Sequence, residues 1–137
     1  MASMIKAAAP KLRQLRRVIR KVPDKKLDMA SFRNDCGTAC CAASHAARDP
    51  WFRAQGLRWS RTEKAPKYTV DGITYYGGQA LKRFFGLPDA TTDYLFALDF
   101  GSVSSSPSPV TKAEVLENID RLLSGKRALP YEAAAIR

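Results

Sequence analysis

The sequence predicts a mainly helical α+β single domain with about five or six helices and one small β-hairpin. Three observations support this fold class. The chain has 137 residues, close to the roughly 150 residues of one domain. Apolar residues recur at steps of three and four in several segments, which is the period of an α-helix. One segment rich in aromatic and β-branched residues surrounds an Asp-Gly pair, which is typical of a β-hairpin.

The first predicted element is a basic amphipathic helix of about a dozen residues within residues 1–26. Its apolar residues follow steps of three, four and three and share one helix face: Leu12, Leu15, Ile19 and Val22. Pro10 is expected to begin the helix and Pro23 to end it.

This segment also carries most of the net charge. The chain has a formal charge of +10, and residues 1–26 hold nine cations and one acid, a net +8. The candidate binding residues of this helix are Lys11, Arg13, Arg16, Arg17, Arg20 and Lys21. Such a cluster suits nucleic-acid phosphates or an acidic protein partner. The alternative is a solvated cationic face on a helix that docks through its apolar stripe.

The second predicted helix, residues 36–48, consists mostly of small side chains, which indicates a buried helix in close contact with its neighbours. It holds three cysteines and the single histidine of the chain: Cys36, Cys40, Cys41 and His45. The two pairs with a spacing of four point in different directions, so this helix alone cannot form a tetrahedral zinc site. No metal or cofactor is expected. We expect buried thiols and a histidine hydrogen-bonded to the backbone.

Cys36 is a candidate nucleophile because a helix N-terminus favours the thiolate. Residues 34–37, Asn-Asp-Cys-Gly, are similar to the Asp-Cys-Gly start of papain-like and bacteriocin-processing cysteine peptidases. Such enzymes use a histidine far downstream, but no histidine follows His45, which lies about 13 Å along the helix from Cys36. The sequence therefore favours a protein that is not an enzyme, with thiol-dependent activity at Cys36 as an alternative.

Two elements are predicted in the middle of the chain. Asp49 and Pro50 form the N-cap and first turn of a brief helix that Gly56 closes. Residues 68–76 form the β-hairpin, whose central Asp-Gly pair suits a type I′ turn.

Two short helices follow, over residues 79–85 and 88–98, and Gly86 terminates the first of them. A serine-rich loop is predicted over residues 101–109.

The last predicted helix begins at a capping box formed by Thr111 and Glu114. The expected organisation is a basic helix in residues 1–26, a globular α+β domain in residues 27–125 and a loosely held tail in residues 126–137.

A second candidate binding surface lies in residues 48–68, where six cations and two acids give a net charge of +4. Its candidate binding residues are Arg53, Arg58, Trp59 and Arg61. Aromatic side chains flanked by arginine suit single-stranded nucleic acid. The same residue types are enriched at protein interfaces, and aromatic core residues surrounded by cations are a third interpretation.

The order of features resembles that of a group of small bacterial and phage-encoded proteins of uncharacterised function, over residues 27–124. The matching residues are Leu27-Asp28-Met29, Cys36-Gly37-Thr38-Ala39-Cys40, His45, Phe84-Phe85-Gly86-Leu87, Leu95-Phe96 and Thr111. Where that group often has a glycine after the second cysteine, this chain has Ala43 and Ser44. The resemblance implies a compact fold and a phage context, and it implies no activity and no catalytic residues.

Composition excludes several classes of protein. Eight Gly, eight Pro and three Cys exclude collagen, low-complexity disorder and a disulfide-rich module. No apolar run approaches the ~20 residues of a membrane span, and no secretory stretch is present, so we expect a cytoplasmic protein without a membrane partner, in the host cytoplasm if phage-encoded.

The function that these patterns favour is non-enzymatic binding of nucleic acid, mainly through its phosphates and without strong sequence preference. The alternative is a phage-type accessory or anti-host factor that binds and modulates an acidic host protein.

Overall fold

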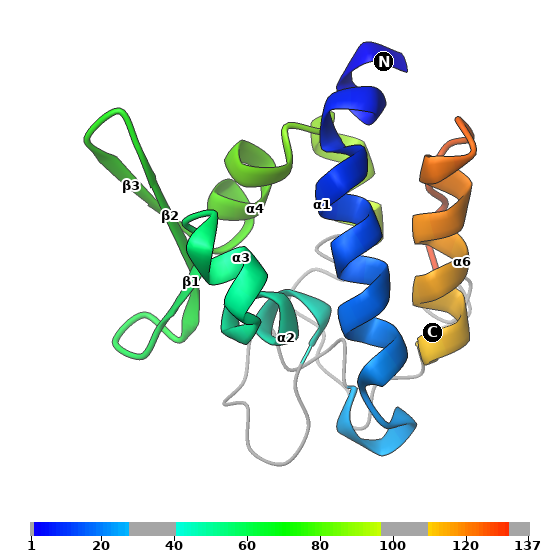
Figure 1. Ribbon diagram of the computed structural model, residues 1–137, viewed down its shortest axis with the longest axis horizontal. Helices are drawn as coiled ribbons and strands as arrows, with labels where there is room; N and C mark the ends of the chain where they lie inside the picture. The colour runs from blue at the N-terminus through cyan, green and yellow to red at the C-terminus, as the bar shows by residue number, and fades with distance from the viewer. Residues whose placement is uncertain (1, 28–40, 97–109, 132–137) are drawn as a thin grey trace.

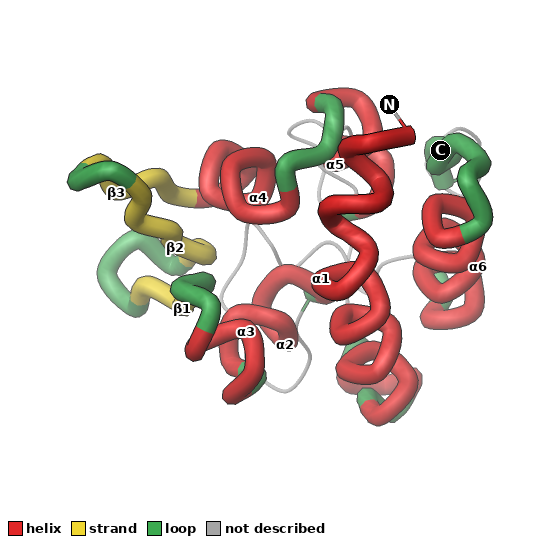
Figure 2. Tube along the Cα trace, turned by 45° about the horizontal axis from the view of Figure 1, so that its top comes forward, coloured by secondary structure: helices red, strands yellow, loops and turns green. Residues whose placement is uncertain are grey.

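The computed structural model describes residues 2–27, 41–96 and 110–131. Within these residues the chain forms six α-helices, one short 3₁₀-helix (η1, Asp24–Lys26) and one three-stranded antiparallel sheet. Figure 1 shows the sheet at one end of the molecule and α6 at the other, with α1 between them, and Figure 2 shows the same order from a second direction. The predicted fold class, a mainly helical α+β domain, is confirmed.

Helix α1 (Ala2–Lys21) carries a continuous apolar stripe. The stripe residues are spaced alternately three and four apart and are all buried: Ile5, Ala8, Leu12, Leu15, Ile19 and Val22. The helix ends two residues before Pro23, as predicted, but Pro10 lies inside it. The prediction that Pro10 begins the helix is wrong because Ile5 and Ala8 extend the stripe toward the N-terminus. Their burial offsets the hydrogen bond that a proline nitrogen cannot donate.

Helix α6 (Lys112–Leu123) packs along α1. Its predicted capping box is present, since the Thr111 hydroxyl accepts from the Glu114 backbone N–H and the Glu114 carboxylate accepts from the Thr111 backbone N–H. The side chains that α6 buries are Val115, Asn118, Ile119 and Leu122.

Two polar contacts at the rim fix the alignment of α1 with α6. Arg16 Nη1 lies 2.8 Å from Asp120 Oδ1. Lys112 Nζ donates to the Arg20 carbonyl oxygen at 2.7 Å, so a cation from α6 satisfies one of the last carbonyls of α1. Helix α1 is thereby held on the rest of the molecule both by its apolar stripe and by these two polar contacts with α6.

Helix α2 (Ala42–Arg48) packs against α1 and buries the side chains of five of its seven residues. The predicted burial of this small-residue helix is confirmed, with Ala42 and Ala46 fully buried. The predicted start near residue 36 is wrong, because Cys41 is extended and serves as the N-cap. The reason is local propensity: the run of alanine, the best helix former, begins at Ala42.

A sharp corner joins α2 to α3 (Pro50–Ala54). Asp49 is the N-cap of α3, as predicted, and its carboxylate accepts hydrogen bonds from the backbone N–H groups of Trp51 and Phe52. Gly56 follows with φ +103°, and a Cβ at this position would lie 3.3 Å from the ring of Tyr68. The close approach of the sheet to this turn therefore requires glycine.

The sheet has the strand order β1 (Arg58–Ser60), β2 (Ala65–Val70) and β3 (Ile73–Tyr76). Strands β2 and β3 form the predicted hairpin, with positive φ at both residues of the Asp71-Gly72 turn as a type I′ turn requires. The sequence patterns did not identify β1 as a third strand, since it is only three residues long.

Helix α4 (Gly77–Phe85) covers the sheet and leads to α5 (Asp89–Leu95). Gly86 ends α4 in the left-handed conformation, with φ +66°, as predicted. The ring of Phe84 packs edge-on against Tyr68 at a centroid distance of 5.3 Å. The end of the predicted helix 88–98, from residue 97, and the whole predicted loop 101–109 lie outside the described residues.

The segment after α6 is anchored, which corrects the expectation of a tail that is loosely held from residue 126. Asn118 is buried and makes two hydrogen bonds with the backbone of Leu129, one as donor and one as acceptor. Tyr131 is 3% exposed, and its hydroxyl donates to the Leu95 carbonyl oxygen at 2.8 Å. Residues 132–137 lie outside the described residues.

Replacing Asn118 with alanine should release this segment. The backbone N–H and C=O of Leu129 lose their partners, which is expected to cost about 1–3 kcal/mol. Urea unfolding measures this loss, and trypsin cleavage at Lys126 or Arg127 should become faster. As a control, Thr111→Ala should cost about 1 kcal/mol through the lost N-cap and leave the cleavage rate nearly unchanged. Equal cleavage rates in the two variants would contradict the anchoring role of Asn118.

Candidate functional site

A groove of about 490 Å³ lies between the α2–α3 corner and the sheet. We call it the cationic groove, and its described lining residues are Ala47, Arg48, Arg53, Arg58, Trp59, Arg61 and Lys67. Five of these seven residues are cations and none is an acid. Clustered positive charge of this kind attracts anions and raises their local concentration.

Four successive elements place these side chains around the groove. Arg48 ends α2 and Arg53 lies in α3, so the Asp49 cap that makes the α2–α3 corner sets their separation. Asp49 is also held by the side-chain amide of Gln14, whose Nε2 lies 3.3 Å from Asp49 Oδ2. This contact ties the corner to α1. The opposite wall comes from β1, the turn after it, and β2.

The strand register brings two cations of this wall directly together. Arg58 on β1 pairs with Lys67 on β2, and side chains of directly paired residues emerge on the same face of a sheet. Both line the groove. Like charges at opposed positions destabilise a sheet, so this pair lowers the stability of the protein in the absence of an anion.

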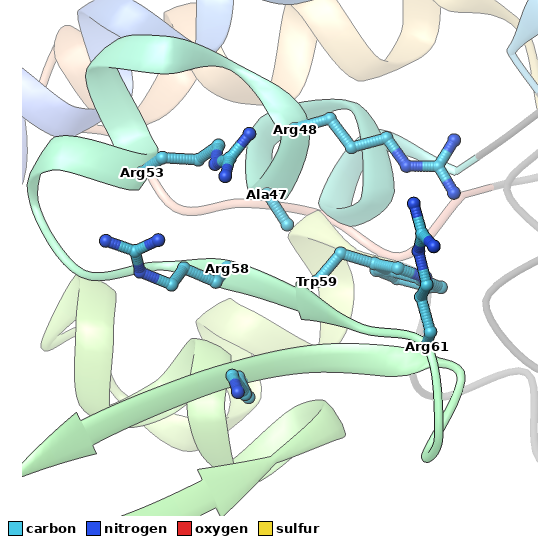
Figure 3. A pocket seen from close by; sticks show the side chains of 7 residues that line it. Ala47, Arg48, Arg53, Arg58, Trp59 and Arg61 are labelled. Atoms are coloured by element: carbon cyan, nitrogen blue, oxygen red, sulfur yellow. The ribbon is translucent and has the colours of Figure 1, made fainter.

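Trp59 supplies the aromatic ring of the groove, and Arg48 lies close to it. Trp59 is half-buried and packs against the core, and the Arg48 guanidinium carbon lies 5.4 Å from the centroid of its ring. Figure 3 shows Arg61 reaching toward the same end of the groove, while Arg53 and Arg58 lie toward the other end. The groove thus has cations at both ends and a cation–π contact between Arg48 and Trp59 at one of them.

The structure brings together all four candidate residues of the aromatic and basic stretch, namely Arg53, Arg58, Trp59 and Arg61. It adds Arg48 and Lys67, which belong to the same stretch but were not singled out as binding residues. The pairing of β1 with β2 brings Lys67 into the groove, and no sequence pattern identified β1 as a strand.

The six candidate residues of α1 divide into two groups. Arg13, Arg17, Arg20 and Lys21 are exposed, as is Lys6. Their positions lie opposite the buried stripe on a helix of 3.6 residues per turn. We call this exposed row the α1 ridge, made of Lys6, Arg13, Arg17, Arg20 and Lys21.

The other two candidates, Lys11 and Arg16, have partners in other helices. Arg16 is held by Asp120. Lys11 Nζ donates to the Phe84 carbonyl oxygen at 2.6 Å and lies 4.2 Å from the centroid of the Phe84 ring, so it satisfies a carbonyl in the last turn of α4. Burial lowers the pKa of the Lys11 ammonium below its ordinary value. Lys11 is thus held by α4, and its part in ligand binding stays a prediction.

The cysteine and histidine cluster is seen in part. His45 Nε2 lies 2.9 Å from the Lys26 carbonyl oxygen, which confirms the expected backbone hydrogen bond of this histidine. Cys41 is buried. Cys36, the candidate nucleophile, and Cys40 lie outside the described residues. Over the described parts of the chain, no group of three or more His, Cys, Asp and Glu side chains could hold a metal ion.

Comparison with protein-family models, curated proteins and solved structures finds no match to this chain. Across residues 2–27, 41–96 and 110–131, no helix has both the length and the apolar composition needed to span a bilayer.

Two single variants, Lys11→Met and Arg17→Met, should distinguish a cation that stabilises the fold from an exposed one by their free energies of unfolding. Lys11→Met should lower the free energy of unfolding by about 1–2 kcal/mol, since a partly buried hydrogen bond to a charged donor is lost. Arg17→Met should change stability by about 0.5 kcal/mol or less, because Arg17 is exposed. Urea unfolding near neutral pH provides the comparison, and similar losses in both variants would contradict the assignment.

The same pair of variants tests, through the pH dependence of stability, how folding changes the pKa of the partly buried Lys11 ammonium. Because the pKa of Lys11 is lowered by folding, the unfolded chain binds this proton more tightly than the folded protein does. The free energy of unfolding should therefore gain a contribution as pH rises from the lowered pKa to the ordinary lysine value. Unfolding titrations in that alkaline range should show this gain in the Arg17→Met protein and not in the Lys11→Met protein.

Proposed function

We propose that this protein binds nucleic acid, mainly through phosphate groups and without strong sequence preference. The observation that carries the proposal is the cationic groove, in which five cations and no acid line one concave surface among the described residues. Proteins hold phosphate backbones with clustered arginine and lysine, and arginine adds bidentate geometry.

The directly opposed Arg58 and Lys67 support this proposal. A pair that opposes folding would be relieved by an anion placed between the two side chains. Trp59 supports it further, because an aromatic ring among cations is the arrangement found in surfaces that bind nucleic acid strands.

The α1 ridge supplies a second row of cations. It runs from Lys6 to Lys21, about 22 Å at 1.5 Å per residue. This length corresponds to about six phosphates along one strand of a B-form duplex. Gln14 of α1 contacts the Asp49 cap of α3, so the ridge is carried by a helix fixed to one wall of the groove. We propose that the ridge adds affinity for longer nucleic acids.

Fluorescence anisotropy with short labelled DNA and RNA single strands tests the proposal across a range of salt concentrations. If each of the five groove cations neutralises one phosphate, log K should fall against log salt with a slope of about −3.5. Affinity should then drop about 100-fold between 50 and 200 mM salt. The absence of binding at low salt would overturn the proposal.

A pair of double variants localises the binding site. Arg53→Ala with Arg58→Ala should weaken binding and bring the slope to about −2, since two phosphate contacts are lost. The matched control is Lys126→Ala with Arg127→Ala, which removes the same charge from exposed positions after α6, away from the sheet. Equal losses of affinity in the two variants would assign binding to net charge rather than to the groove. A stoichiometric complex with an acidic protein that survives nuclease treatment, without oligonucleotide binding, would favour a protein partner instead.

A further inference from the structure

We propose that one face of the three-stranded sheet binds a single strand of nucleic acid, with a phosphate held by Arg58 and Lys67 and the adjoining base stacked on the ring of Tyr76. This inference rests on the proposed function and names its substrate class. The observation behind it is the strand register, which puts these three residues in one row across β1, β2 and β3.

The row follows from the pairing of the strands. Arg58 pairs with Lys67, and Lys67 pairs in turn with Tyr76. Side chains of directly paired residues emerge on the same face of a sheet, and neighbouring strands lie about 5 Å apart. Thr69 and Thr74 are also paired and lie two positions along each strand, so they share this face. We call the surface made by these five residues the open face of the sheet.

The opposite face of the sheet is covered by α4. Tyr68 and Tyr75 are paired on that face. The ring of Tyr68 packs on Phe84. The Arg83 guanidinium carbon lies 4.8 Å from the centroid of the Tyr75 ring. Both contacts come from α4, and Figures 1 and 2 show this helix on the side of the sheet toward the rest of the molecule. The open face therefore points away from α4.

Tyr76 offers an aromatic surface to a ligand. It is 44% exposed, and within the described residues its ring contacts no other aromatic ring and no cation. A lone exposed aromatic side chain is ordinary on a protein surface. Its neighbour in the row, however, is Lys67, which also lines the cationic groove. An aromatic ring beside cations suits a stacked base whose adjoining phosphates the cations hold.

The open face is continuous with the cationic groove, because Arg58 and Lys67 belong to both. A phosphate between these two opposed cations relieves their repulsion. A strand that runs from Tyr76 past this pair enters the groove. Arg53 and Arg61 line the groove as well and can hold further phosphates.

Stacking on Tyr76 selects an unpaired base. A base inside a duplex has both faces covered by its neighbours, so it must leave the stack to reach the ring, which costs energy. A base of a single strand reaches the ring at lower cost. Removal of the ring should therefore weaken the binding of single strands and leave the binding of duplexes unchanged.

Two variants of Tyr76 test this inference. Tyr76→Leu removes the ring and Tyr76→Phe keeps it, and neither removes a capping hydrogen bond from α4, since the Tyr76 side chain makes none. In anisotropy titrations with a short labelled single strand, Tyr76→Leu should bind about five- to 150-fold more weakly, the range expected for loss of one stacked base. Tyr76→Phe should retain the affinity. The slope of log K against log salt should stay the same in both, because no phosphate contact is lost.

Control ligands and a control variant isolate the stacked base. Tyr76→Leu should bind an abasic strand with the same number of phosphates, and a duplex of the same length, as tightly as the unchanged protein does. Ile73→Ala is the matched variant, because Ile73 lies on β3, is 54% exposed and emerges on the opposite face from Tyr76. It should leave single-strand affinity unchanged. Circular dichroism and thermal unfolding check that the three variants remain folded.

The outcomes separate this inference from the proposed function. Unchanged single-strand affinity in Tyr76→Leu, or an equal loss for abasic strands, for duplexes or in Ile73→Ala, would overturn stacking on Tyr76. Salt-dependent binding would in that case still support phosphate recognition by the groove. If no strand binds at low salt, the proposed function fails and this inference fails with it. A nuclease-resistant complex with an acidic protein that Tyr76→Leu abolishes would then assign the open face to a protein partner.

Discussion

The apolar stripe of α1 is the contact on which the rest of the structure depends. Its central residues Leu12, Leu15 and Ile19 are fully buried, and the helix packs against both α6 and α2. Full burial of one such side chain contributes about 1.5–3 kcal/mol. The most charged segment of the chain is therefore also part of its hydrophobic core, and the orientation of the α1 ridge is set by that packing rather than by the ridge itself.

The same packing positions the cationic groove. Gln14 extends from α1 to Asp49, which caps α3 and separates Arg48 from Arg53. On the other side of the groove, the edge-on contact of Tyr68 with Phe84 holds the sheet against α4. Lys11 of α1 in turn donates to the Phe84 carbonyl oxygen. Both walls of the groove are thus connected to one helix through short, specific contacts.

Turns and helix ends could be read from the sequence because their chemistry is local. The Thr111 capping box, the Asp49 N-cap and Gly86 in the left-handed conformation all depend on a few adjacent residues. What could not be read depends on contacts distant in sequence. Pro10 lies within α1 because of the burial of Ile5 and Ala8, and Lys11 donates to a carbonyl oxygen 73 residues away.

The residues of the candidate site also differ in whether local sequence or a long-range contact identifies them. Arg53, Arg58, Trp59 and Arg61 stand out because cations and aromatics alternate over a short stretch, whereas Lys67 enters the groove only through its strand register with Arg58. Three-residue β1 has too short a pattern to be distinguished from a loop.

The contact of Arg16 with Asp120 joins positions 104 residues apart. During synthesis at about 5–20 residues per second, the partner of α1 emerges about 5–20 s after α1 itself. Over that interval the stripe of the basic helix has no α6 to cover it, so the nascent chain exposes an amphipathic cationic segment before the domain can close. Because closure needs such distant contacts, folding should be slower than in a helical bundle of similar size with mostly local contacts. The helix that anchors the finished fold is therefore made before the elements that cover it, and it is among the last to be fully packed.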